Sequence, residues 1–401
     1  MEEFLPIKSF RVKNFKGIRD SGDVRFTPLT VFIGNNGSGK SSLIEALQTY
    51  QDIVVNGLDK AMNRWRGFEN IHNPPISLVG ENEKKNESNF IEFNIIGEYG
   101  DLRLTYLIKS DIELTHNELR IAKEIFDFKD EKPFIYRDFD GNLQSYDEII
   151  GKIQTKTYSI FHDLFVEGFI SNNKQLNKNP IETSRFVDAG DRIKNWQFTT
   201  LNPANMVHPL PLQRTGRLNP DGSNIAEYLM DIRKKSQDAY DGIIKSLTHV
   251  LPYLKDMKPN ITTELERTVY LRMHESDFTV PQWLLSTGTM RILCLLALFR
   301  HPTPPPVIFI EEIENGLDPR TIHFIVEEIR SLIVLGKSQV VITTHSPYLL
   351  DLLDLSQIVV VERENSETTF HRPDEKALES WSKKFGPGKL YTMDRLAHRE
   401  G

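Results

Sequence analysis

The stretch LTVFIGNNGSGKSSLIEALQTY, residues 29–50, decides how the amino-terminal part of the chain folds. Its first residues form an apolar run that is typical of a buried strand, and this run ends at Gly34. After the glycine-rich turn, apolar residues recur at the spacing of a helix: Leu43, Ile44, Leu47 and Tyr50. A strand, a glycine-rich turn and an amphipathic helix in direct succession indicate an α/β fold.

The turn matches the phosphate-loop pattern G-x-x-x-x-G-K-[ST] from Gly34 to Ser41. The backbone N–H groups of residues 36–41 are expected to wrap the β-phosphate of ATP, because the N-terminus of a helix attracts anions. We expect Lys40 to reach the β- and γ-phosphates and the Ser41 hydroxyl to bind Mg²⁺. The residues predicted to bind the nucleotide here are Gly34, Asn35, Asn36, Gly37, Ser38, Gly39, Lys40, Ser41 and Ser42. The flanking strand and helix argue against a plain glycine turn with a surface lysine.

Two adjacent carboxylates follow the apolar strand in VIFIEEIENGLDP, residues 307–319. Neighbouring side chains at the end of a strand point in different directions, so Glu311 and Glu312 are expected to have different tasks. We assign Glu311 to Mg²⁺, through a bound water, and Glu312 to general-base or water-orienting work. Taken alone, paired acids at a strand end are as often only a solvated terminus.

Two further stretches complete the predicted site. WLLSTGTMR, residues 283–291, places a turn with Ser286 and Gly288 before a helix, which is a second anion-binding N-terminus. Since the phosphate loop already fills its own site, this turn is expected to serve a nucleotide held by another copy. VVITTHSP, residues 340–347, ends a strand at His345, which is expected to contact the γ-phosphate or the attacking water. The plainer interpretations are an ordinary capped helix and a structural histidine.

In combination, these stretches resemble a known group of ATPases. The phrases VKNFKG (residues 12–17), LSTGT, EEIENGLDP and THSP stand in the order found in ABC-type ATPase heads of the RecF, SMC and Rad50 kind. The chain looks most like the prokaryotic AAA-15/AAA-21 ATPases and the ATPase half of OLD-family proteins, and RLNPDGSNIAEYL, residues 217–229, is a further shared phrase. The resemblance implies an α/β fold: an ABC-type P-loop ATPase head with an antiparallel β subdomain and a mixed helical insertion.

The resemblance also implies a division of the chain and a site shared between two chains. Residues 1–50 and 283–401 form a discontinuous ATPase core lobe, and residues 51–282 form an inserted β-hairpin and helical region. Two heads would clamp two ATP molecules, with Ser286 and Gly288 of one subunit completing the site of the other and Asp318 near the boundary. Lys16 adds a contact to the nucleotide, for which a solvated surface lysine is the alternative. The implied reaction is hydrolysis of ATP to ADP and phosphate, with Mg²⁺.

The middle of the chain shows several local patterns. Residues 90–108 alternate apolar and polar side chains around Gly100-Asp101, and residues 133–146 do so around Asp140-Gly141, so both predict β-hairpins. Between residues 223 and 250 the apolar spacing predicts one or two helices, capped by Ser223 or Asn224. No heptad pattern is sustained, which argues against a long coiled-coil arm.

Composition narrows the class of protein. The 401 residues carry a net charge of −7, which does not indicate a nucleic-acid binder. The single cysteine, Cys294, lies in an apolar run and is expected to be a buried structural thiol, so neither a disulfide nor a cysteine-based zinc site is possible within one chain. Neither a membrane-spanning run nor a secretory signal is found in the sequence, so a cytoplasmic protein without membrane contact is expected.

Two functional hypotheses follow. In the first, a regulatory ATPase acts as a homodimer, or as an assembly of dimers, on a separately encoded effector, a nuclease or toxin, in anti-phage defence. The residues after His345 are too few for a Toprim nuclease domain. In the second, a DNA-repair or chromosome-maintenance ATPase binds DNA through the basic residues of segment 8–25. A transporter motor fits poorly, because such ATPases have a shorter insertion and a fuller LSGGQ-type phrase.

Overall fold

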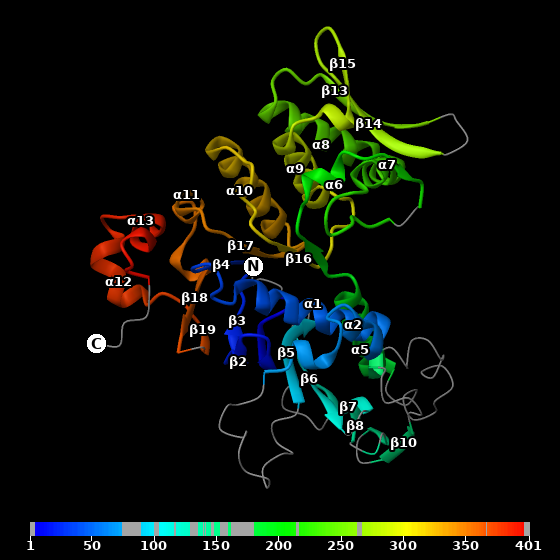
Figure 1. The fold of residues 1–401 in the computed structure, drawn as a ribbon, viewed down its shortest axis with the longest axis vertical. Coiled ribbons are helices and arrows are strands. Elements are labelled where there is room, and N and C mark those ends of the chain that lie inside the picture. Colours follow the sequence, from blue (N-terminus) through cyan, green and yellow to red (C-terminus); the bar gives the residue numbers. More distant parts are fainter. Residues whose placement is uncertain are drawn as a thin grey trace.

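In the computed structural model most of the chain forms strands and helices, which Figure 1 shows. The described residues are 5–73, 90–99, 104–115, 118–128, 135–138, 140, 142–145, 148–152, 159–161, 180–213, 216–262, 267–365 and 367–396. Strands and helices alternate in the parts that flank the phosphate loop and in the last third, so the α/β expectation is confirmed.

A mostly parallel sheet carries the predicted site. Its strands, in spatial order, are β11 (Gln197–Thr199), β16 (Val307–Ile310), β17 (Gln339–Thr343), β4 (Leu29–Ile33), β18 (Ile358–Glu364) and β19 (Glu367–His371). Neighbours from β11 to β18 pair in parallel, whereas β19 folds back on β18 as an antiparallel hairpin. The carboxyl ends of β4, β16 and β17 therefore meet at one edge, where ligands bind in sheets of this kind.

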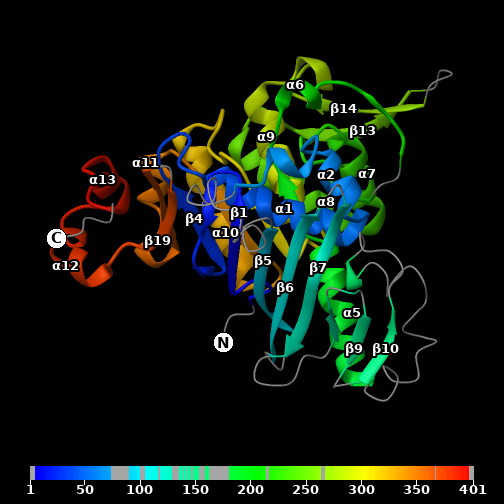
Figure 2. The same ribbon diagram turned by 60° about the horizontal axis from the view of Figure 1, so that its bottom comes forward.

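A second sheet is antiparallel and packs beside the first. In spatial order it contains β10 (Glu148–Lys152), β9 (Asn142–Ser145), β8 (Ile135–Arg137), β7 (Glu118–Phe128), β6 (Leu104–Thr115), β5 (Phe90–Tyr99), β1 (Ser9–Phe15) and β2 (Ile18–Asp20), and β3 (Val24–Arg25) pairs with β1. Figure 2 shows β5, β6 and β7 as long neighbouring strands. The predicted hairpins correspond to β5–β6 and β8–β9, but Gly100, Asp101 and Gly141 of their turns lie outside the described residues.

Helices cover the sheets and join them. Their bounds are α1 (Lys40–Asn56), α2 (Leu58–Asn63), α5 (Pro180–Lys194), α6 (Pro203–Met206), α7 (Ile225–Lys235), α8 (Gln237–Val250), α9 (Thr287–Phe299), α10 (Pro319–Val334), α11 (Pro347–Leu350), α12 (Glu375–Ser382) and α13 (Pro387–Thr392). The expected helical region after residue 223 is two helices, α7 and α8, and Asn224 is the N-cap residue of α7. A small antiparallel sheet of β12 (Leu210–Pro211), β13 (Asp256–Ile261), β14 (Thr268–His274) and β15 (Thr279–Pro281) lies beside them in Figure 1.

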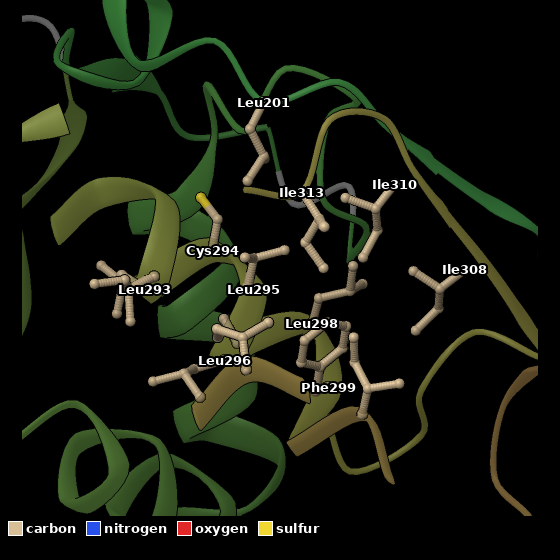
Figure 3. Close-up of a cluster of buried hydrophobic side chains, with 14 of the residues drawn as sticks. Leu201, Leu293, Cys294, Leu295, Leu296, Leu298, Phe299, Ile308, Ile310 and Ile313 are labelled. Atoms are coloured by element: carbon tan, nitrogen blue, oxygen red, sulfur yellow. The ribbon is translucent and has the colours of Figure 1, made fainter. Parts of the chain in front are cut away.

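The parallel sheet divides the interior into two cores, because successive side chains of a strand point to opposite faces. Val31 and Ile33 of β4 belong to the core shared with α7 to α10, whereas Phe32 belongs to the core shared with α1 and the antiparallel sheet. Figure 3 shows the first core, with side chains of α9 facing Ile308 and Ile310 of β16. The strands that lead to the site, β4, β16 and β17, are therefore packed on both faces.

Cys294 lies in the first core. It is fully buried, and burial raises the pKa of its thiol, so the expected structural thiol is confirmed. None of the helices that the structure describes is both long and apolar enough to span a membrane.

Candidate functional site

The phosphate loop lies between β4 and α1 and is closely covered by β18 and β19. A Cβ atom at Gly34, whose φ is +153°, would lie 2.1 Å from the carbonyl oxygen of Val361, and one at Gly39, whose φ is +114°, would lie 2.6 Å from Cγ2 of Thr368. Both residues have a positive φ that residues with a side chain rarely adopt, and neither position has space for a Cβ atom. Packing alone thus requires glycine at both positions.

Lys40 begins α1 and its side chain folds back over the loop. Its ammonium donates to the carbonyl oxygens of Gly34, at 2.7 Å, and Asn35, at 3.0 Å. Burial lowers the pKa of Lys40, and the nearby carboxylates of Glu312 and Glu314 oppose that shift. The carbonyl contacts hold the cation at the loop, where an incoming phosphate can replace them.

Glu311 joins the end of β16 to the start of α1. The Ser41 hydroxyl donates to its Oε2 at 2.8 Å, and the Thr200 hydroxyl donates to its Oε1 at 3.3 Å. The two residues that the sequence assigns to Mg²⁺ are therefore in direct contact. Thr200, which follows β11, was not predicted from the sequence, because it comes from a distant segment without a motif.

Glu312 has an unusual backbone conformation. Its φ is +47°, in the left-handed region, and its N–H donates to Oγ1 of Thr343 at 2.9 Å. The carboxylate accepts a hydrogen bond from the Asn315 side chain. Non-glycine residues in this region are strained by about 1 kcal/mol or more and often lie at functional sites. The carboxylate of Glu312 thus contacts Asn315, whereas that of Glu311 contacts Ser41.

His345 follows the neighbouring strand β17. Its backbone N–H donates to Oε1 of Glu314 at 2.6 Å, which ties it to the turn after β16. Glu314 is half-buried and was not assigned a role from the sequence. The carboxylate fixes the start of the segment that carries His345, so Glu314 is a positioning residue for this histidine.

Lys40, Ser41, Glu312 and His345 line one cavity of about 360 Å³, whereas Glu311 and Glu314 do not line it. Its lining includes the loop and start of α1, the strand ends and the β18–β19 hairpin: Gly17, Asn36, Gly37, Gly39, Lys40, Ser41, Ser42, Glu312, Thr343, His345, Arg363 and Thr368. The volume lies within the range of small-ligand sites, about 300–1,000 Å³. The structure thus brings together residues that the sequence separates by some three hundred positions.

Ser286 and Gly288 lie outside this cavity of their own chain. Ser286 is the N-cap residue of α9 and accepts from the Thr289 N–H at 3.1 Å, as the sequence predicts. A Cβ atom at Gly288 would lie 3.0 Å from the carbonyl oxygen of Gly316, so this turn packs against the turn after Glu312. Ser286, Gly316 and Asp318 are exposed, and they form one solvent-facing region.

Lys16 lies at the edge of the site, in a left-handed conformation with φ +50°. Its ammonium pairs with Glu45 at 2.7 Å and lies 4.0 Å from the centre of the Trp65 ring. It lines a neighbouring cavity rather than the one around Lys40.

Comparison with known proteins identifies the family of this chain. A family profile described as "AAA domain, putative AbiEii toxin, Type IV TA system" matches residues 29–351, more than half of the chain. The chain belongs to this family. It is an ATPase, and a nucleotide is its substrate.

A curated relative and a solved structure agree with this assignment. The chain is 19% identical, over 359 residues and 87% of each chain, to an "ATP/GTP phosphatase" of Helicobacter pylori. It is also similar to the crystal structure of an SMC head bound to the C-winged helix domain of ScpA, with a TM-score of 0.54 and 15% identity over 92% of this chain and 99% of that chain. This likeness confirms the ABC-type ATPase head fold.

The donor groups of this AAA-domain ATPase suit magnesium. A hydroxyl and a carboxylate, Ser41 and Glu311, offer the hard oxygen ligands that Mg²⁺ prefers, and Mg²⁺ is usually held by few protein ligands together with phosphates and waters. The described residues contain no group of three or more His, Cys, Asp or Glu side chains that could hold a metal. A site completed by the nucleotide is consistent with both observations.

Sequence reasoning missed several residues that line the cavity around Lys40. Thr343 and Thr368 are common residue types without a motif, and Arg363 lies near the end of strand β18 without a motif of its own. Pairing of β18 with β4 would have indicated that the end of β18 approaches the phosphate loop, but that pairing cannot be inferred from local periodicity.

Proposed function

We propose that ATP binding closes a homodimer of this ATPase and that hydrolysis reopens it. One observation carries the proposal: Lys40, Ser41, Glu312 and His345 line one cavity, while the exposed turn with Ser286 and Gly288 lies outside it. A second anion-binding helix start that does not serve its own cavity suits a phosphate held by another copy. In this arrangement each site takes Ser286 and Gly288 from the partner chain.

Each residue then has a stated role in hydrolysis. The loop N–H groups and Lys40 hold the phosphates, and Ser41 with Glu311 would hold Mg²⁺, which neutralises phosphate charge when bound. Glu312 accepts a proton from the water that attacks the γ-phosphorus, as the bond from that phosphorus to the β,γ-bridging oxygen breaks. His345 contacts the γ-phosphate or the attacking water.

The dimer is controlled by differential affinity. A nucleotide that contacts both chains binds the closed dimer more tightly than the open form, and loss of the γ-phosphate removes that difference. Trp283 and Leu284, whose exposed fractions are 50% and 69%, precede Ser286 and enlarge the apolar part of the proposed interface.

Mixing two inactive variants tests the shared site. Lys40→Ala removes the phosphate contact from one chain, and Ser286→Arg blocks the contribution of that chain to its partner. In a mixed dimer the chain with an intact loop is the Ser286→Arg chain, and it receives an intact Ser286 from the Lys40→Ala chain. We expect each variant alone to be nearly inactive, and an equimolar mixture to regain up to one working site per mixed dimer. Full activity of Ser286→Arg alone would refute the shared site.

We further propose that the dimer regulates a separately encoded nuclease or toxin in anti-phage defence. Support comes from the resemblance to OLD-like ATPases and from the family description, which names a toxin and a toxin–antitoxin system. Expression of the ATPase with its neighbouring genes should reduce phage plaque formation, and Lys40→Ala should abolish the reduction. Equal plaque counts with wild type and with an empty vector would argue against this role.

Direct DNA binding is less well supported. Five of the six basic residues of the opening segment, all but Arg25, are engaged with carboxylates, in the ion pairs Lys8–Glu98, Arg11–Asp20, Lys13–Glu92, Lys16–Glu45 and Arg19–Glu367. A surface neutralised in this way attracts phosphates weakly. No specific feature therefore favours a DNA-repair function over regulation of a partner protein.

A further inference from the structure

Arg363, near the end of β18, lies where three cavities adjoin. It lines the phosphate cavity, a cavity of about 440 Å³ beside residues 34–38 of the loop, and a cavity of about 450 Å³ that contains Gly17, His72 and Asn73. Arg363 thus places a cation on the wall of the phosphate cavity, on a strand far in sequence from the phosphate loop.

The surroundings of Arg363 leave its guanidinium available. Its Cζ lies 3.8 Å from the position of a Cβ atom at Gly17, so a larger residue at position 17 would crowd it. The adjoining Thr368 is buried and donates to the Gly17 carbonyl oxygen at 3.2 Å, which ties the β18–β19 hairpin to the turn between β1 and β2. Within the described part of the chain, no protein group forms a hydrogen bond or an ion pair with the Arg363 side chain.

Other nearby cations are already engaged. Lys16 is paired with Glu45 and Trp65, and Arg19 is paired with Glu367 at 2.8 Å. Arg363 thus differs from its neighbours in having a free charge beside the cavity of Lys40. A guanidinium offers two parallel N–H donors that suit phosphate oxygens.

We propose that Arg363 binds the phosphate chain of the nucleotide, near its nucleoside end. Glu312 and His345 mark the γ-phosphate side of the cavity, since the general base must face the attacked phosphorus. The cavity of Gly17, His72 and Asn73 meets the phosphate cavity at Gly17 and Arg363 and contains neither Glu312 nor His345. A nucleotide that extends from Glu312 toward this junction passes the guanidinium. This inference rests on the proposed nucleotide site.

The test compares Arg363→Ala and Arg363→Lys with the wild type, using titration calorimetry with Mg-ATP, Mg-ADP and inorganic triphosphate. We expect Arg363→Ala to weaken all three by about tenfold or more, because a charge-assisted contact is lost. Arg363→Lys should recover part of the loss, since it keeps the charge but not the planar pair of donors. Arg11→Ala is the matched control, an arginine of the opening segment that pairs with Asp20 and lines none of these cavities, and circular dichroism confirms folding of each variant.

The outcomes separate this inference from the proposed function. Unchanged affinity of Arg363→Ala, with binding lost in Lys40→Ala, would overturn the role of Arg363 alone. Weaker ATP binding with unchanged triphosphate binding would overturn the phosphate contact, because it would place the guanidinium against the base or ribose. Unchanged ATP binding in Lys40→Ala would overturn the nucleotide site itself.

Discussion

At the scale of single residues, Glu312 combines backbone strain with a carboxylate that faces the nucleotide cavity. Its φ of +47° is the cost of directing two successive carboxylates to different places. Glu311 reaches Ser41, whereas Glu312 is turned by its backbone and held by Thr343 and Asn315. A simple alternation of side chains at a strand end would not produce this arrangement.

Substitution of Glu312 by glycine or alanine should separate strain from chemistry. Both variants lose the carboxylate and are expected to lose hydrolysis, but glycine accepts the left-handed backbone and alanine does not. Glu312→Gly should therefore be more stable than Glu312→Ala by about 1 kcal/mol, measured by urea unfolding. Equal free energies of unfolding would contradict a strained backbone at this position.

Candidate site residues could be predicted from the sequence where they belong to a motif, and could not be predicted where they do not. The contact between Ser41 and Glu311 follows the assignment of both to one metal ion, and Ser286 is the predicted cap. Thr200, Glu314 and Arg363 could not be found, because their places depend on which strands pair and on how a turn folds. No alternation or spacing in a local stretch contains that information.

At the scale of secondary structure, α10 depends on Asp318. Its carboxylate accepts from the N–H groups of Arg320, at 3.0 Å, and Thr321, at 3.2 Å, and from the Thr321 hydroxyl at 2.5 Å. The hydrogen bond from the Thr321 hydroxyl contributes most to lowering the pKa of Asp318. The helix therefore begins at a residue that is also exposed beside Gly316 in the proposed interface.

Asp318→Ala should destabilise the monomer by about 0.5–2 kcal/mol at neutral pH, as loss of an N-cap does. Since the folded-state pKa of Asp318 lies below the unfolded value, the stabilisation is fully present above the unfolded pKa of about 3.9 and is lost as the pH falls through the folded-state pKa. The difference in unfolding free energy between wild type and Asp318→Ala should therefore shrink in acid. A difference that stays constant across this range would exclude the carboxylate as its source.

The secondary structure was predictable where its pattern was long and strong. The residues around the phosphate loop, the helix that begins after Ser286 and the strand before Glu311 agree with the sequence. Strand β7 and the small sheet of β12 to β15 were not predicted, although β7 pairs with β6 and β13 pairs with β14, the strands next to them in sequence. β11, within residues 51–282, joins the parallel sheet, which only the tertiary structure shows.

At the scale of the whole molecule, the proposed dimer makes the oligomeric state depend on ATP. Glu312→Gln should bind ATP without hydrolysing it and should remain dimeric, with a mass about twice the 46.3 kDa of one chain in analytical ultracentrifugation. ADP should leave the same variant monomeric. An ATP-bound monomer at micromolar protein concentration would contradict the proposed closure.

A matched variant tests the face itself. Leu284→Arg places a charge at an exposed apolar residue two positions before Ser286 and outside the phosphate cavity. In the Glu312→Gln background it should prevent dimer formation while leaving nucleotide binding by the monomer measurable. Dimers of undiminished stability would place the interface elsewhere.

The contact of Thr368 with Gly39 has a consequence for synthesis of the chain on the ribosome. The phosphate loop leaves the ribosome early, but the strands beside it, β17 and β18, and the covering strand β19 are translated more than three hundred residues later. At translation rates of about 5–20 residues per second, the loop waits on the order of 15 to 65 s before its cavity can form. The cavity is therefore complete only after β19 has been translated, and we expect a nascent chain to bind its nucleotide late in synthesis.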